Sequence, residues 1–126
     1  MKTIIATNKA PGAVGPYSQA VRSGSTLYVS GSLGLDPATG TFTGTTVEEQ
    51  ARQVMENLKA VIEEAGFTMD SVVKCSCFLA DMNDFAAFNG IYGEYFGADP
   101  PARECVQAAR LPKDALVEVS AVCAID

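Results

Sequence analysis

Residues 47–65 contain the strongest structural pattern in the chain, an apolar repeat with helical spacing. Apolar residues recur at steps of three and four along this segment, which places them on one side of an α-helix. Thr46 and Glu49 occupy the two positions of a capping box, and Gly66 suits the left-handed conformation that ends many helices. Charged and amide side chains occupy the other side. The pattern therefore predicts an amphipathic helix that lies on a sheet.

Strand-like segments surround this helix, and a second helix is predicted at 84–96 from its row of aromatic residues. The strands are expected at 17–22, 26–31, 72–80, 102–109 and 116–124, with a shorter one near 41–43. The order of elements predicts an α/β fold with a mixed sheet: a single domain over residues 1–126 with both helices on one face. The other face then has no cover within the chain, which favours self-association.

The chain contains no histidine, and this absence excludes several kinds of catalytic site. Ser-His-Asp triads, Cys-His dyads and HExxH metal sites all require imidazole. The cysteines do not indicate a metal site, since the C-x-C spacing of Cys75 and Cys77 is not usual for zinc. We interpret the cysteines as ordinary buried thiols and expect no metal. Catalysis must then use carboxylates, Arg, Lys, Tyr, Ser, Cys, backbone groups or water.

The charge balance argues against a nucleic-acid partner. The net charge is −6, and the basic residues are scattered along the sequence, whereas binding to phosphates needs a basic face. No apolar run is long enough to span a membrane, and the first residues lack the apolar stretch of a secretory signal. We therefore expect a cytoplasmic protein.

Two charged residues on predicted strands are candidates for a functional site. Arg103 stands where a strand begins, and an arginine beside apolar strand residues can hold a carboxylate through two parallel hydrogen bonds. A structural ion pair at a sheet edge explains Arg103 equally well. Glu118 lies between Val117 and Val119. Its side chain either faces water on an alternating strand or faces a pocket and orients a water molecule there.

Four further residues suit contact with a ligand. Ser30 and Gly31 end a predicted strand, and glycine lets a ligand approach the backbone, although a plain strand end is the alternative. Tyr17 follows a Gly-Pro turn, and a buried structural role is equally consistent with that position. Asn89 lies on or beside the apolar side of the second helix, where its amide needs a partner from the backbone or from a ligand.

Several segments together resemble the Rid (YjgF) family of reactive-intermediate deaminases. They cover nearly the whole chain, and their combination is more specific than any one of them. They are GPYSQAV (15–21), the strand end at Ser30-Gly31, QARQVMENLKAVIEEAG (50–66), VVKCSCFLADMNDFAAFN (72–89), PARECVQAARLP (101–112) and LPKDALVEVSAV (111–122).

The resemblance implies a chorismate-mutase-like fold and a homotrimer with clefts between subunits. It also implies hydrolysis of reactive 2-imino or 2-enamino acids, such as 2-aminoacrylate, to 2-oxo acids and ammonia, without a cofactor. In this family such intermediates escape from pyridoxal-phosphate dehydratases. By the same likeness Arg103 holds the substrate carboxylate and Glu118 orients or deprotonates the attacking water. The other implied pocket residues are Tyr17, Ser30, Gly31, Asn89 and Cys105, the last chiefly through its backbone.

One residue departs from the family pattern. The position after the arginine is usually small, and here it is Glu104, which strand alternation turns away from Arg103. Glu104 is consistent with an exposed strand start, with an ion pair to a neighbouring arginine, or with repulsion of an anionic substrate. Two other functions therefore stay open. One is a non-catalytic module that binds 2-oxo acids in the same clefts. The other is an RNA-directed inhibitor of translation, against which the charge balance argues.

Overall fold

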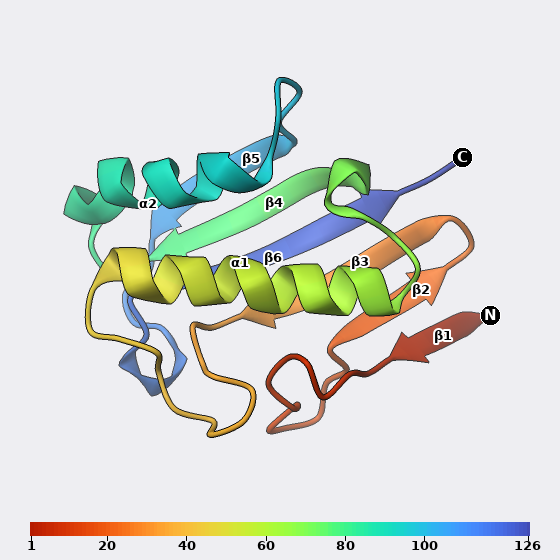
Figure 1. Ribbon diagram of the computed structural model, residues 1–126, viewed down its shortest axis with the longest axis horizontal. Helices are drawn as coiled ribbons and strands as arrows, with labels where there is room; N and C mark the ends of the chain where they lie inside the picture. The colour runs from red at the N-terminus through yellow and green to blue at the C-terminus, as the bar shows by residue number, and fades with distance from the viewer.

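The computed structural model describes residues 1–126 and contains a six-stranded mixed sheet with two α-helices on one face (Figure 1). The helices are α1 (Val47–Glu64) and α2 (Phe85–Tyr92). The strands are β1 (Lys2–Ile5), β2 (Ala20–Ser23), β3 (Thr26–Ser32), β4 (Val72–Leu79), β5 (Ala102–Gln107) and β6 (Val117–Ala124). This architecture confirms the predicted α/β fold with its helices packed on a mixed sheet.

The last strand of the chain lies in the middle of the sheet. The strand order is β1-β2-β3-β6-β4-β5, so β6 separates β3 from β4. It pairs antiparallel with both of these neighbours, whereas β4 and β5 form the one parallel pair. In Figure 1 the blue β6 crosses the sheet behind α1, and α1 packs on β3, β6 and α2.

Alternation along β6 and β4 separates the two faces of the sheet. Val117, Val119 and Ala121 of β6 are buried, and so are Cys75 and Cys77 of β4. All five belong to one core cluster with the apolar side of α1. The residues between them in the sequence therefore face the opposite side of the sheet, which neither helix covers.

The ends of α1 form as the sequence predicts. Thr46 accepts a hydrogen bond from the backbone of Glu49, and the Glu49 side chain accepts one from the backbone of Thr46, which confirms the capping box. At the other end Gly66 has a φ of 83°. The N–H of Phe67 then donates to the carbonyl of Ile62 at 3.1 Å, and this bond satisfies a carbonyl that the helix leaves free.

Several predicted elements differ from those of the structure. The strand expected at 102–109 ends at Gln107. The helix expected at 84–96 is α-helical only over Phe85–Tyr92, and short 3-10 turns flank it from Met82 and from Gly93. Glycine at this point weakens the α-helical conformation. The strand expected near 41–43 is reduced to a bridge between Leu35 and Phe42.

The N-terminal part of the sheet also differs. The strand expected at 17–22 begins only at Ala20, because Gln19 turns its side chain onto the preceding loop and bonds the backbone of Thr7 and Pro11. Strand β1 is absent from the sequence-based prediction. Its four residues are mostly exposed at the sheet edge, so they carry no alternating pattern of burial.

Neither helix of the structure has the length and apolar character needed to cross a membrane. The four cysteines are free thiols, and Cys75, Cys77 and Cys123 are buried. Burial raises the pKa of each of these three thiols, so they remain protonated at neutral pH and act as small apolar residues.

We predict that Thr46→Ala lowers the free energy of unfolding by about 1 kcal/mol, because the first turn of α1 loses its side-chain cap. Urea denaturation followed by circular dichroism measures this change. Thr45→Ala is the matched control, since the Thr45 hydroxyl makes no hydrogen bond and only its backbone N–H contacts Glu49. Equal stability of the two variants would show that the cap contributes nothing.

Candidate functional site

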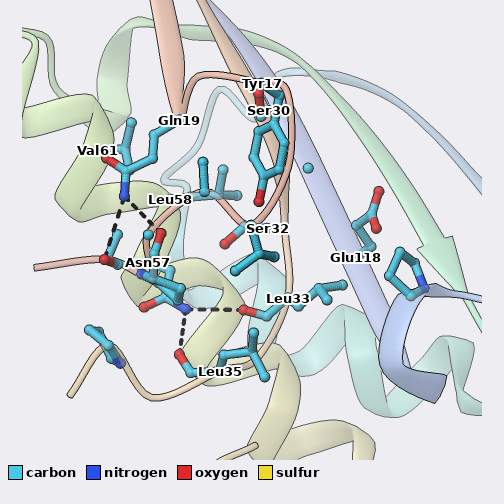
Figure 2. Close-up of a pocket in the computed structure, with 18 of the residues that line it drawn as sticks. Tyr17, Gln19, Ser30, Ser32, Leu33, Leu35, Asn57, Leu58, Val61 and Glu118 are labelled. Atoms are coloured by element: carbon cyan, nitrogen blue, oxygen red, sulfur yellow. Dashed lines mark hydrogen bonds between the residues drawn. The ribbon is translucent and has the colours of Figure 1, made fainter. Parts of the chain in front are cut away.

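A cavity of about 660 Å³ opens beside the end of β3, and four of the predicted site residues line it. These are Tyr17, Ser30, Gly31 and Glu118. Figure 2 shows Tyr17 and Ser30 on the same side of this cavity, with Glu118 facing them from β6. The structure therefore brings together residues from a loop, from β3 and from β6 that are far apart in the sequence.

The Glu118 carboxylate lies directly against the backbone of Gly31. A methyl group built on Gly31 would overlap the carboxylate, and its distance to the Glu118 Cδ would be only 2.8 Å. The pairing of β3 with β6 shifts register between Val29 and Ser32, so Ser30 and Gly31 form a bulge at this point. Gly31 is therefore required by the close approach of the Glu118 side chain. Contact of Gly31 with a ligand stays a prediction.

Ser30 and Tyr17 are placed by the loop that precedes β2. The Ser30 hydroxyl donates to the carbonyl of Ser18 at 2.6 Å, and its N–H donates to the carbonyl of Gln19 at 3.0 Å. Tyr17 is 49% exposed, so the buried structural role that its position also allowed is wrong. Tyr17 lines the cavity.

The environment of Glu118 favours the protonated carboxyl more than water does. The side chain is half-buried on the central strand, and burial raises the pKa of Glu118. Its neighbours Val117 and Val119 are fully buried, so the strand itself is fixed by the core. A carboxylate whose pKa is raised accepts a proton more readily than an ordinary glutamate does.

Arg103 forms a second group of predicted residues at the β5 edge of the sheet. Its Nη1 donates to Oδ1 of Asn89 at 2.7 Å, and its guanidinium carbon lies 4.9 Å from the ring centroid of Tyr92 and 5.5 Å from that of Phe85. The partner of Asn89 is thus a side chain rather than the backbone. Two aromatic rings and an amide hold the guanidinium, and no carboxylate pairs with it.

Cys105 lies two residues along β5 on the same side as Arg103. It pairs in register with the buried Cys77, and burial raises the pKa of Cys105 while Arg103 opposes that shift. A protonated thiol is a poor nucleophile. This position fits a pocket contact better than covalent catalysis. No group of Cys, Asp or Glu side chains is arranged to hold a metal ion.

The two groups of residues face opposite sides of the sheet. Arg103 pairs in register with Cys75, which is fully buried on the helix side. Glu118 pairs in register with Phe78, which faces the open side between the buried Cys77 and Leu79. Neighbours in register share a face. Within one chain, therefore, Arg103 and Glu118 do not meet across a single pocket.

Glu104 forms an ion pair away from Arg103, as alternation predicts. Lys74 Nζ lies 3.0 Å from Glu104 Oε1, and the Ser76 hydroxyl donates a hydrogen bond to the other carboxylate oxygen. These contacts, with the Ser76 bond first, lower the pKa of Glu104. Glu104 is exposed near the start of β5, as one interpretation of the sequence had it. It also forms an ion pair, but the expected arginine partner is wrong, because the partner is Lys74.

The cavity also has lining residues that the sequence analysis did not name. Lys113 lines it, and both Lys113 and Asp114 have a φ of 57°. Such left-handed backbone is uncommon outside glycine, and no local pattern in the sequence announces it. Asn57 of α1 is a second missed residue: it is 1% exposed and lines the same cavity.

Comparison with known proteins identifies the family. The model of the family described as Endoribonuclease L-PSP, which includes the Rid (YjgF) proteins, matches residues 7–125. The chain belongs to this family. The resemblance found in the sequence is therefore confirmed.

Three members of the Rid family show how close the likeness is. A RutC family protein from Synechocystis is 53% identical, with 97% of this chain and 95% of that protein covered. The 2-iminobutanoate/2-iminopropanoate deaminase of Capra hircus is 46% identical, with 97% and 89% covered. The crystal structure of E. coli TdcF with bound serine has a TM-score of 0.95 and is 42% identical, with 98% and 99% covered.

We predict that Glu118→Gln makes the protein more stable than the wild type at pH 7, and that the difference disappears towards pH 4. Burial raises the folded-state pKa of Glu118, so the folded state binds this proton more tightly than the unfolded state does. The stability from that proton is complete below the ordinary glutamate pKa of about 4.3 and is lost as the pH rises through the folded-state value. The uncharged glutamine avoids this loss.

Urea denaturation of both proteins at pH 4 and pH 7 measures the effect. Glu63→Gln, which changes an exposed glutamate of α1, is the control and should show no comparable gain. A constant difference between Glu118→Gln and the wild type at both pH values would contradict the assignment.

Proposed function

We propose that this protein hydrolyses reactive 2-imino and 2-enamino acids to 2-oxo acids and ammonia. The observation that carries the proposal is the half-buried Glu118 carboxylate, with its raised pKa, at the wall of a cavity beside Gly31. A relative that is 46% identical is named as a 2-iminobutanoate/2-iminopropanoate deaminase. The activity needs no metal or organic cofactor, and we assign it to the cytoplasm as a means of removing reactive metabolites.

The reaction suits the groups that this chain offers. The imine carbon is already electrophilic, so the protein needs to position the substrate and move protons rather than supply a strong nucleophile. Glu118 takes a proton from water as the water oxygen bonds to the carbon of the protonated imine, and the C=N electron pair moves onto the nitrogen. Glu118 then returns this proton to the nitrogen of the carbinolamine. The C–N bond breaks to release ammonia, the hydroxyl group gives its proton to water, and a 2-oxo acid remains. One water molecule is consumed for each ammonia released.

The substrate carboxylate binds Arg103 of a second copy of the chain in this proposal. Arg103 and Glu118 face opposite sides of one sheet, as their register partners Cys75 and Phe78 indicate. The guanidinium is oriented by Asn89 and by two aromatic rings without a carboxylate partner, so it is prepared for an anion. A site between subunits joins this anchor to the Glu118 cavity.

The uncovered face of the sheet supports assembly with further copies, and we propose the homotrimer of the Rid family. Ile4, Val21, Tyr28 and Val122 are successive register partners across four strands. Ile4 is 52% exposed and Tyr28 is 54% exposed. A continuous apolar row of this kind gains free energy when another subunit covers it.

Glu104 does not prevent binding of an anion in this proposal. Its carboxylate is engaged by Lys74 and Ser76 on the open face, whereas Arg103 faces α2. The negative charge of Glu104 is thus partly balanced and points away from the guanidinium. We infer that activity survives this departure from the family pattern.

We predict that Arg103→Ala reduces kcat/KM for 2-aminoacrylate by about 30-fold to 5,000-fold, which corresponds to the loss of about 2–5 kcal/mol for a buried charge pair. The substrate is generated in place by a serine dehydratase, and pyruvate release is followed. Arg52→Ala removes a surface arginine that pairs with Glu94 and should retain wild-type activity. If the wild-type protein does not accelerate pyruvate release over buffer, the proposed reaction is wrong. Thermal stabilisation by a 2-oxo acid without turnover of any imine would favour the non-catalytic binding module.

We also predict that two inactive variants restore each other. Arg103→Ala and Glu118→Gln each lose activity alone. When they are unfolded together and reassembled in equal amounts, about a quarter of the sites between subunits receive both wild-type residues. The mixture should therefore recover about that fraction of wild-type activity, because the two residues come from different copies. No recovery, with trimers shown by sedimentation, would place both residues in the same copy.

A further inference from the structure

Three residues of α2 contact the guanidinium of Arg103, and their spacing puts them on one face of the helix. Phe85, Asn89 and Tyr92 follow one another at steps of four and three, which is the spacing of neighbours on a helix surface. The guanidinium carbon lies 5.5 Å from the Phe85 ring centroid and 4.9 Å from that of Tyr92. Nη1 donates to Oδ1 of Asn89 at 2.7 Å. One face of α2 therefore contacts a single cation.

The remaining donors of Arg103 are available to a ligand. Its Nε and Nη2 make no hydrogen bond and no ion pair within the chain. Neither nitrogen is enclosed by protein, because the Tyr92 hydroxyl is the one buried side-chain oxygen or nitrogen without a hydrogen-bond partner. Nε and Nη2 form an edge of the guanidinium that can bind a carboxylate through two parallel hydrogen bonds. The contacts with α2 thus leave this edge accessible.

Tyr92 contributes its ring to this arrangement and not its hydroxyl. Tyr92 is 6% exposed, and its hydroxyl makes no hydrogen bond. Burial raises the pKa of Tyr92, so the phenol stays protonated at neutral pH. The rings of Phe88 and Phe96 pack against Tyr92, with centroids 5.4 and 5.0 Å away, and hold it in place. The face of a fixed aromatic ring attracts a guanidinium electrostatically.

We propose that Phe85 and Tyr92 are positioning residues for the imine hydrolysis: their rings fix the plane of the Arg103 guanidinium and, through it, the plane in which the substrate lies. This inference rests on the proposed deaminase function and adds to it how the substrate is oriented. Two rings and one hydrogen bond constrain the guanidinium at three points, whereas the hydrogen bond alone would let it rotate.

The orientation of the guanidinium matters because the substrate is planar. A carboxylate that accepts two parallel hydrogen bonds lies in the guanidinium plane. In a 2-imino acid the carboxylate favours the plane of the C=N bond, because the two groups are conjugated. Water attacks the imine carbon perpendicular to that plane. The guanidinium plane therefore decides whether the carbon faces the water at Glu118, and such alignment of reacting groups contributes strongly to the rate.

A double-mutant cycle tests this role. The kcat/KM is measured for 2-iminopropanoate, which an amino acid oxidase generates from alanine, with semicarbazide as the competing trap. Tyr92→Leu should lower kcat/KM about tenfold to a hundredfold, because the guanidinium is no longer held in its plane. In the Arg103→Lys background the same substitution should lower kcat/KM less than about threefold, because an ammonium is a point charge with no plane to fix. Equal losses in both backgrounds would show general damage to α2 and overturn the inference.

Two further variants separate the ring from its hydroxyl and from core packing. Tyr92→Phe should keep kcat/KM within about twofold of the wild type, because the hydroxyl that it removes has no hydrogen-bond partner. The matched control is Phe67→Leu, which removes a buried ring 5.0 Å from the guanidinium carbon of Arg22, outside the site. It should lower stability without lowering kcat/KM. A loss of kcat/KM in either variant as large as that in Tyr92→Leu would overturn the inference.

Phe85→Leu keeps the test valid if Tyr92→Leu does not fold. Phe85 is 38% exposed, so its ring contributes little to the core. Phe85→Leu should lower kcat/KM about threefold or more in the wild-type background and less in Arg103→Lys, and equal losses would contradict the proposed role. If the wild type hydrolyses 2-iminopropanoate but neither cycle shows coupling, only this inference fails. If the wild type does not accelerate hydrolysis over buffer, the proposed function fails.

Discussion

The pairing of β6 with both β3 and β4 is the constraint on which the rest of the structure depends. Because β6 is the last strand and lies between β3 and β4, the two parts of the sheet are joined only when the C-terminal residues are in place. The fully buried Val117 and Val119 fix its register against α1. Because side chains alternate along a strand, Glu118 must face the opposite side of the sheet. There it contacts Gly31 in the bulge of β3.

The same alternation explains why the candidate site is divided. Arg103 follows the buried register of Cys75 and turns to α2, where Asn89 and Tyr92 hold its guanidinium. Glu118 follows the register of Phe78 and turns to the open face. A sheet keeps these two groups apart within one chain, so a site that uses both requires a second copy. The uncovered apolar row on the open face provides a physical reason for that copy to bind.

Many of the helices and strands could be predicted from short sequence patterns. The 3.6-residue repeat and the capping box of Thr46 and Glu49 predicted α1 together with both of its ends, because helix periodicity and capping depend on residues close in sequence. Strand β1 escaped prediction, since an exposed edge strand has no buried side to create a pattern. The left-handed backbone of Lys113 and the hydrogen bonds from Asn57 to the carbonyls of Leu33 and Leu35 were not predicted either. They depend on packing between distant segments, and the neighbouring residues do not encode them.

The sequence by itself determined the elements, the exclusion of imidazole chemistry, and the residues Arg103, Glu118, Tyr17, Ser30, Gly31, Asn89 and Cys105 as candidates. Only the tertiary structure decided how these residues are grouped. It placed Tyr17, Ser30 and Gly31 around Glu118 in one cavity, and it bound Asn89 to Arg103 on the other face. The physical reason is that strand order and register come from pairing between distant segments, and a shift of one residue would turn each side chain to the opposite face.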